Sequence, residues 1–176
     1  VHVRTVFDAP LAAGSENGGS ASTINASTTG TAALALATEE YGAAAAKKLL
    51  QWRNGSRWEN FVEKMRSLLK EERSATPLFY LAADHREAYE GLSHALPPGK
   101  VTYTKRTCNA QRCDERDCGA MVYSLVDMLN LARTRFILGS TWSSYSEVAA
   151  HWGGSGGNPL TLLLAGKDFG LRPSSA

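Results

Sequence analysis

Residues 136–144, Phe136-Ile137-Leu138-Gly139-Ser140-Thr141-Trp142-Ser143-Ser144, decide the fold class of this chain. Three apolar residues are followed by glycine and a series of hydroxyl-bearing residues, which predicts a short buried strand over 136–138 and then a turn. The segment after the turn, through Val148 to Trp152, predicts a helix. A strand that leads through a polar turn into a helix is typical of α/β proteins.

The sequence before this stretch repeats the alternation of strands and helices. Leu78 to Ala83 is a short apolar run that stops at Asp84, as a buried strand would, and a helical segment follows. This alternation predicts an α/β fold with a doubly wound parallel sheet. We expect strands at 1–4, 78–83, 101–104 and 136–138 and helices at 32–52, 57–72, 86–96, 121–132 and after Ser144.

Three of the expected helices carry more detailed signals. Gly42 predicts an interruption in the helix at 32–52. Ser56 and Glu59 have the spacing of a capping box at the start of the helix at 57–72. That helix has one apolar stripe, formed by Trp58, Phe61, Val62, Met65, Leu68 and Leu69, which should lie against the sheet. In the helix at 121–132, one side carries Val122, Leu125, Val126 and Leu129.

Length and composition favour one globular domain over residues 1–176, with a Gly/Ser/Thr-rich insertion around 12–31. The net charge of +2 comes from interspersed charges, so nucleic-acid binding is not expected. The sequence has no apolar run of membrane-spanning length, and from these residues we expect neither a membrane span nor a signal peptide. Because it opens abruptly in a strand-like segment, we expect an upstream region to be missing.

Cysteine spacing argues against a metal site. Cys108, Cys113 and Cys118 follow one another at intervals of five, which is neither a CxxC pair nor a zinc-finger spacing. In an oxidising compartment two of them could close a small disulfide loop. The glycosylation sequons at Asn25 and Asn54 are compatible with a secretory-pathway protein.

Candidate ligand-binding residues follow the expected strands, because parallel α/β sheets bind ligands at the carboxyl ends of their strands. Arg4 could hold a pyrophosphate through its guanidinium, or it could form an ion pair with an acidic neighbour. Ser143 and Ser144 could bind an anion together with the first amides of the next helix, or they could simply cap that helix.

Two aspartates are further candidates. Asp127 lies between apolar residues, where a carboxylate needs a partner, either a nucleobase edge or a buried Arg or Lys. Asp84 could accept a hydrogen bond from a ribose or base, or it could cap the helix that follows. From the residues alone, these signals predict an α/β domain that binds a phosphorylated ligand.

Three motifs resemble those of the GDP-fucose-dependent fucosyltransferase superfamily, which includes the α-1,6-fucosyltransferases and the plant xyloglucan fucosyltransferases. Val1-His2-Val3-Arg4 is similar to the strand and arginine that open their donor-binding domain, and Leu81-Ala82-Ala83-Asp84 is similar to their middle strand. The segment from Asp127 through Ile137 to Gly154 is similar to their closing motif. The three motifs occur in the family's order and frame nearly the whole chain.

The resemblance implies a Rossmann-like half of a GT-B glycosyltransferase that transfers fucose, with inversion and without a metal, from GDP-fucose to a glycan or protein hydroxyl. Arg4 would contact the pyrophosphate and support catalysis, and Asp127 would read guanine. Asp84 would contact base or ribose, while Ser143 and Ser144 would bind phosphate. His2 would support the sheet or contact the base. The expected location is the secretory pathway, in the Golgi lumen or outside the cell.

The sequence also departs from the family pattern. Thr5 stands where the α-1,6 enzymes have a second basic residue, and Asp8 and Glu16 are the candidates for the catalytic base. The chain has no room for the acceptor domain of these enzymes. Two alternatives therefore remain open, which are a non-catalytic relative within a larger luminal or extracellular assembly and a transferase that uses another nucleotide sugar.

Overall fold

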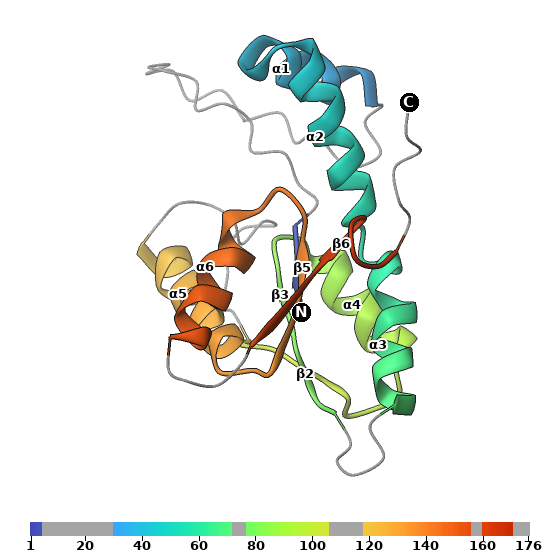
Figure 1. Cartoon of the computed structure of the whole chain (residues 1–176), viewed down its shortest axis with the longest axis vertical. Helices are drawn as coiled ribbons and strands as arrows, with labels where there is room; N and C mark the ends of the chain where they lie inside the picture. The colour runs from blue at the N-terminus through green and yellow to red at the C-terminus, as the bar shows by residue number, and fades with distance from the viewer. Residues whose placement is uncertain (5–29, 72–76, 106–117, 156–159, 171–176) are drawn as a thin grey trace. The chain divides into compact units, whose positions relative to one another are not determined.

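The computed structural model describes residues 1–4, 30–71, 77–105, 118–155 and 160–170. It is a mixed α/β structure, with short parallel strands and six helices among these residues (Figure 1). The chain divides into two compact units, one formed by Val1–Thr5 with Trp52–Ala176 and the other by Val6–Gln51. The strands and those site candidates that lie within the described residues belong to the first unit.

The strands form three parallel pairs. β1 (His2–Val3) pairs with β3 (Ala82–Ala83), and β2 (Phe79–Tyr80) pairs with β4 (Val101–Thr102). β5 (Phe136–Ser140) pairs with β6 (Thr161–Ala165), so that Ser140 lies opposite Ala165. The parallel direction predicted from the alternation of strands and helices is therefore present in each pair.

Further hydrogen bonds connect these pairs. β2 and β3 are separated by Leu81, whose amide donates to the carbonyl of Thr102 at 2.8 Å on one side. The next amide, of Ala82, donates to the carbonyl of Val1 at 2.9 Å on the other side. One extended segment therefore bonds to β4 along one edge and to β1 along the other.

Two pairs of helices flank the strands of this unit. α3 (Glu59–Glu71) and α4 (Arg86–Ala95) pack into one core cluster, in which Phe61, Met65 and Leu92 are fully buried. α5 (Cys118–Ala132) and α6 (Ser144–Gly154) contribute to a second cluster with Ile137. Figure 1 shows the two pairs on opposite sides of the strands. The apolar stripe predicted for the helix at 57–72 is thus confirmed as a core face.

α1 (Gly30–Tyr41) and α2 (Ala43–Gly55) meet at Gly42, which has a φ of +80°. Glycine adopts this left-handed conformation without the steric penalty of a Cβ atom. The interruption predicted at Gly42 is confirmed. Most of the Gly/Ser/Thr-rich insertion, residues 12–29, lies outside the described residues.

The predicted capping box at Ser56 and Glu59 is wrong. The amide of Ser56 donates to the carbonyls of Trp52 and Arg53, so this residue closes α2 instead of opening α3. Its hydroxyl is buried and has no hydrogen-bond partner in the described part of the chain. The Glu59 carboxylate pairs with Arg57 at 3.1 Å instead of reaching back to Ser56.

Two features of the second half of the chain were not anticipated. The side of α5 that carries Val122, Leu125, Val126 and Leu129 is exposed, while Asp127 and Leu131 are buried. β6 was not predicted, although the apolar run at 160–165 carries a strand signal.

No helix within the described ranges is both long and apolar enough to cross a bilayer.

Candidate functional site

The carboxyl ends of β1, β3 and β5 lie next to one another. The amide of Arg4, directly after β1, donates to the hydroxyl of Ser140 at 2.8 Å, and that hydroxyl donates to the carbonyl of His2 at 3.1 Å. The amide of Asp84, directly after β3, donates to the carbonyl of Val3 at 3.3 Å. The backbones of Arg4 and Asp84 and the turn after β5 therefore share one edge of the strands.

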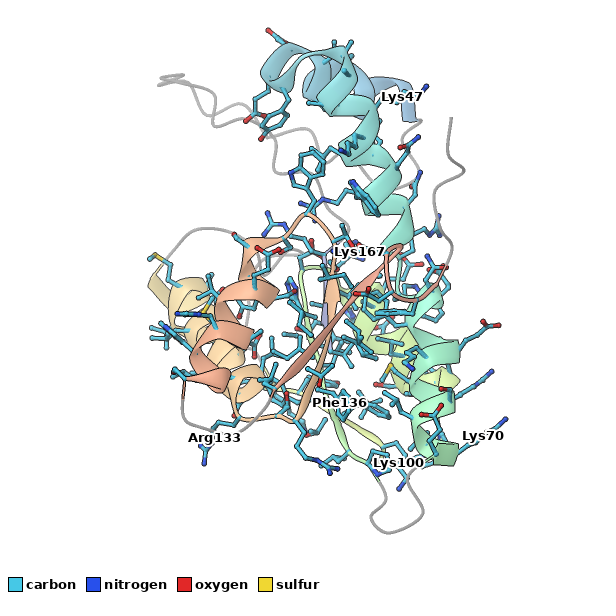
Figure 2. The ribbon with its side chains drawn as sticks, in the orientation of Figure 1. Lys47, Lys70, Lys100, Arg133, Phe136 and Lys167 are labelled. Carbon is cyan, nitrogen blue, oxygen red and sulfur yellow. The ribbon has the colours of Figure 1, made fainter. Side chains whose placement is uncertain are left out.

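Figure 2 helps to locate this edge, which we call the carboxyl edge: the ends of β1, β3, β5 and β6 and the residues that follow them. Phe136 begins β5 and Lys100 precedes β4, and both lie near the opposite, amino ends of the strands. Lys167 lies at the carboxyl edge, beyond the end of β6. Lys167 was not among the predicted site residues, because the strand before it, β6, was not predicted either.

Ser143 and Ser144 begin α6 at this edge. Ser143 occupies the N-cap position and is buried, but its side chain makes no capping hydrogen bond to the helix. Ser144 is the first helical residue and is exposed. An α-helix leaves its first amides without intrahelical partners, and these amides favour anions. Ser143 therefore occupies the predicted N-cap position, but its hydroxyl does not make the capping hydrogen bond that this alternative implied.

His2 links β1 to the first turn of α6. Its Nδ1 atom lies 2.7 Å from the hydroxyl oxygen of Ser146, and its ring packs on that of Tyr145 with the centroids 4.6 Å apart. Burial, with the positive charges of Arg4 and Arg53 among the further causes, lowers the pKa of His2 from 6.5 to about 3. His2 is therefore a neutral, buried side chain that joins a strand to a helix.

Arg53 is a cation at this edge that the sequence analysis did not find. Its Nη1 atom donates to the carbonyl of Arg4 at 3.2 Å. Arg53 belongs to the last turn of α2, 49 positions from Arg4, and no local pattern in the sequence connects the two residues. The carboxyl edge thus has one guanidinium residue at the end of β1 and a second that bonds to its backbone.

No protein-family model and no curated protein sequence matches this chain.

Asp127 lies inside the structure, where it is 1% exposed. The hydroxyl of Tyr80 donates to its Oδ1 atom at 2.6 Å and also contacts the hydroxyl of Thr104. Burial, followed by the hydrogen bond to Asp127, raises the pKa of Tyr80. The buried carboxylate of Asp127 therefore has a tyrosine hydroxyl among its partners. The two partners considered from the sequence were a nucleobase edge and a buried Arg or Lys.

Asp84 does not cap α4. The N-cap residue is His85, whose Nδ1 atom accepts a hydrogen bond from the amide of Glu87 at 3.3 Å. The end of β3, just before Asp84, is bonded to Tyr89 of α4. The hydroxyl of Tyr89 accepts a hydrogen bond from the amide of Ala83 and donates one to the carbonyl of Ala83. The capping alternative for Asp84 is therefore wrong, and its role as a ligand contact stays a prediction.

Several predicted residues lie outside the described ranges, among them Asp8, Glu16, Cys108 and Cys113. Cys118 begins α5, but its side chain is not described. Within the described ranges, no group of three or more His, Cys, Asp or Glu residues could hold a metal ion. The catalytic base and the cysteine pairing accordingly stay predictions.

Proposed function

We propose that this chain is the donor-binding half of a GDP-fucose-dependent glycosyltransferase of GT-B type, built on a Rossmann-like, doubly wound parallel sheet. The hydrogen bonds between the strand pairs support this architecture. If 79–83 counts as one strand, and the hydroxyl of Ser140, which bonds to the backbones of His2 and Arg4, marks β5 as the neighbour of β1, the strands run β4, β2/β3, β1, β5, β6. That order, 3-2-1-4-5 along the chain, would match a doubly wound sheet with its switch point between β1 and β5.

One observation carries the functional proposal, namely the hydrogen bond from the amide of Arg4 to the hydroxyl of Ser140 at 2.8 Å. It joins the strand that ends in a guanidinium to the strand that leads into the N-terminus of α6. Ligands of doubly wound sheets bind at this switch point. A guanidinium and a row of helix amides together match the charge and the oxygen atoms of a diphosphate.

In the proposed reaction, a hydroxyl of a glycan or protein acceptor attacks the anomeric carbon of fucose from the side opposite the nucleotide. The bond between that carbon and the β-phosphate oxygen breaks, the configuration inverts, and GDP departs. Arg4 and the first amides of α6 stabilise the negative charge that develops on the diphosphate. The acceptor proton passes to a base, for which Asp8 and Glu16 are the candidates.

The proposed function also implies a cellular location and a partner domain. An enzyme of this kind meets its acceptors in the secretory pathway, so we place this one in the Golgi lumen. An acceptor-binding domain, supplied by a preceding segment or a larger assembly, would complete the site. No metal takes part in this scheme, because the guanidinium and the helix amides supply the positive charge.

Isothermal titration calorimetry with GDP tests the proposal directly. We expect saturable binding of GDP in a metal-free buffer, and UDP should compete weakly. Saturation by UDP in preference to GDP would support a transferase for another nucleotide sugar. An absence of saturable heat with either nucleotide would contradict the proposal and favour the non-catalytic alternative.

A further inference from the structure

Trp142 has an unusual backbone for its size. Among the described residues other than glycine, it alone has a positive φ, at 60°. The left-handed region is open to glycine at little cost, but a bulky side chain there brings its Cβ atom close to the backbone. Strained residues of this kind persist where the surrounding structure holds them, and they cluster at ligand sites.

The residues on both sides of Trp142 are fixed. The hydroxyl of Thr141 donates to the carbonyl of Ala165, at the end of β6. Ser143 is the buried N-cap of α6, and Ser146 in the first turn bonds to His2. The turn is therefore anchored to β6, to β1 and to α6, and these anchors hold the residue between them in its left-handed conformation.

The side chain of Trp142 differs from its neighbours in exposure. It is 49% exposed, whereas Thr141 and Ser143 are 9% and 7% exposed. The core residues of the preceding strand are Ile137 and Leu138, and the side chain of Trp142 is not one of them. Its exposure therefore does not follow from a role in core packing. Trp142 follows Ser140 by only two positions, and the hydroxyl of Ser140 accepts a hydrogen bond from the backbone amide of Arg4.

We propose that Trp142 is a binding residue whose indole stacks on the flat nucleoside part of the ligand while Arg4 and the α6 amides hold its diphosphate. This inference rests on the function proposed above. An indole offers a wide apolar face and carries no positive charge, so it suits a base or ribose better than a phosphate. Stacking on a ring held by a fixed turn also avoids the entropy cost of ordering a mobile side chain.

Replacement of Trp142 by glycine separates a binding role from a structural one. Glycine accepts the backbone conformation, so W142G should unfold at the same temperature as the wild type or at a higher one. Its affinity for GDP, measured by calorimetry, should fall by roughly tenfold, as for the loss of one stacked base. Its affinity for inorganic pyrophosphate should be unchanged. W142F, which keeps an aromatic ring, should recover most of the GDP affinity.

Trp152 provides the matched control, because it is 46% exposed and lies in an ordinary turn of α6. W152A should bind GDP as the wild type does. W142N gives a second test of the same position, because asparagine tolerates the left-handed region better than other non-glycine residues. It should reproduce the loss of GDP affinity seen in W142G.

The outcomes distinguish this inference from the proposed function. If wild-type protein binds GDP but W142G and W142N bind it equally well, the role of Trp142 is refuted and the proposed function stands. A lower melting temperature together with weaker binding of both GDP and pyrophosphate would show that Trp142 only shapes the turn, and it would also refute the inference. If the wild type binds no nucleotide, both proposals fail.

Discussion

The Nδ1 atom of His2 lies 2.7 Å from the hydroxyl oxygen of Ser146, although the two residues are 144 positions apart. Both side chains are buried. Their hydrogen bond fixes the first turn of α6 against β1, the strand that directly precedes Arg4. The helix amides and the guanidinium proposed to share a diphosphate therefore belong to elements that are joined directly.

Protonation of His2 should destabilise the fold. Burial, the largest cause, lowers the pKa of His2 from 6.5 to about 3, so between these values the unfolded chain binds a proton that the folded protein does not. Folding stability should therefore rise with pH across this window, by up to about 1.4 kcal/mol per pH unit from this group. Above pH 6.5 the contribution of His2 is constant.

Urea unfolding of wild type and H2Q at a series of pH values measures this effect. The difference in unfolding free energy between the two proteins should change between about pH 3 and pH 6.5 and stay level above that range. A difference that is independent of pH throughout would show that His2 can be protonated in the folded protein.

Replacement of Arg4 by alanine should weaken ligand binding without disturbing the fold. Arg4 makes its bonds to Ser140 and Arg53 through its own backbone amide and carbonyl, and alanine retains both groups. Loss of the guanidinium should weaken GDP binding by about 10- to 100-fold, the cost of a hydrogen bond to a charged group. Fucosyl transfer should be abolished. Near-normal affinity in R4A would contradict the assigned role.

Arg53 should support the same site less directly. Its guanidinium donates to the carbonyl of Arg4 at 3.2 Å, so R53Q removes a positive charge and loosens the backbone at the end of β1. We expect GDP binding to weaken by less than in R4A, and more strongly at low salt than at high salt. R57Q is the matched control, because Arg57 is exposed and pairs with Glu59. Equal affinities of R53Q and R57Q would contradict the prediction.

Local patterns predicted most of the elements of this fold. The stripe that includes Phe61 and Met65 predicted the core face of α3, because a helix buries residues at spacings of three and four. The same reasoning does not show which side of α5 is buried. Its exposed side is aliphatic, while its buried side carries Asp127, which is accommodated through the hydroxyl of Tyr80. That bond joins two elements far apart in the sequence.

The carboxyl edge was predictable only for residues that come soon after predicted strands. The positions of Arg4, Asp84 and Ser143 at this edge were predicted because the carboxyl ends of parallel strands meet at one edge, and their roles as ligand contacts stay predictions. Arg53 and the bond between His2 and Ser146 were not found, because both depend on long-range contacts that no periodic pattern encodes. The left-handed backbone of Trp142 was also hidden, because sequence preferences place glycine in such positions.

Gly139 should be required for the close approach of α6 to β5. A Cβ atom at this position would lie 2.7 Å from both the Cβ and Oγ atoms of Ser146, and the Cβ atom of that buried serine is attached directly to the helix backbone. We expect G139A to lower the free energy of unfolding by about 1–3 kcal/mol, as overpacking of a core does. It should also weaken GDP binding, because α6 must shift.

Gly154 offers the control for this substitution. A Cβ atom at Gly154, in the last turn of the same helix, would meet nothing within 4 Å. G154A should therefore be neutral or stabilise the fold by up to about 1 kcal/mol, since alanine restricts the unfolded chain. Thermal unfolding of both variants tests the packing argument, and equal stabilities of G139A and G154A would contradict it.

Asp127 should act in folding and not in nucleotide selection. Its carboxylate is 1% exposed and accepts a hydrogen bond from Tyr80, so a nucleobase could reach it only if this contact opened. Y80F and D127N should each cost about 1–3 kcal/mol of stability, since each disturbs a buried polar pair. In a double-mutant cycle the combined loss should fall short of the sum, because the two residues share one interaction.

The preference for GDP over UDP decides between this structural role and the guanine contact that the sequence resemblance implies. If Asp127 serves the fold alone, D127N should retain the wild-type ratio of the two affinities at a temperature where it remains folded. A guanine contact would instead lower the affinity for GDP and leave that for UDP unchanged, because a carboxylate accepts from the donor edge of guanine, which uracil lacks. Calorimetric titration of D127N with both nucleotides distinguishes these outcomes. Y80F should show the same ratio of GDP to UDP affinity as D127N if the hydroxyl of Tyr80 holds the carboxylate of Asp127 in place.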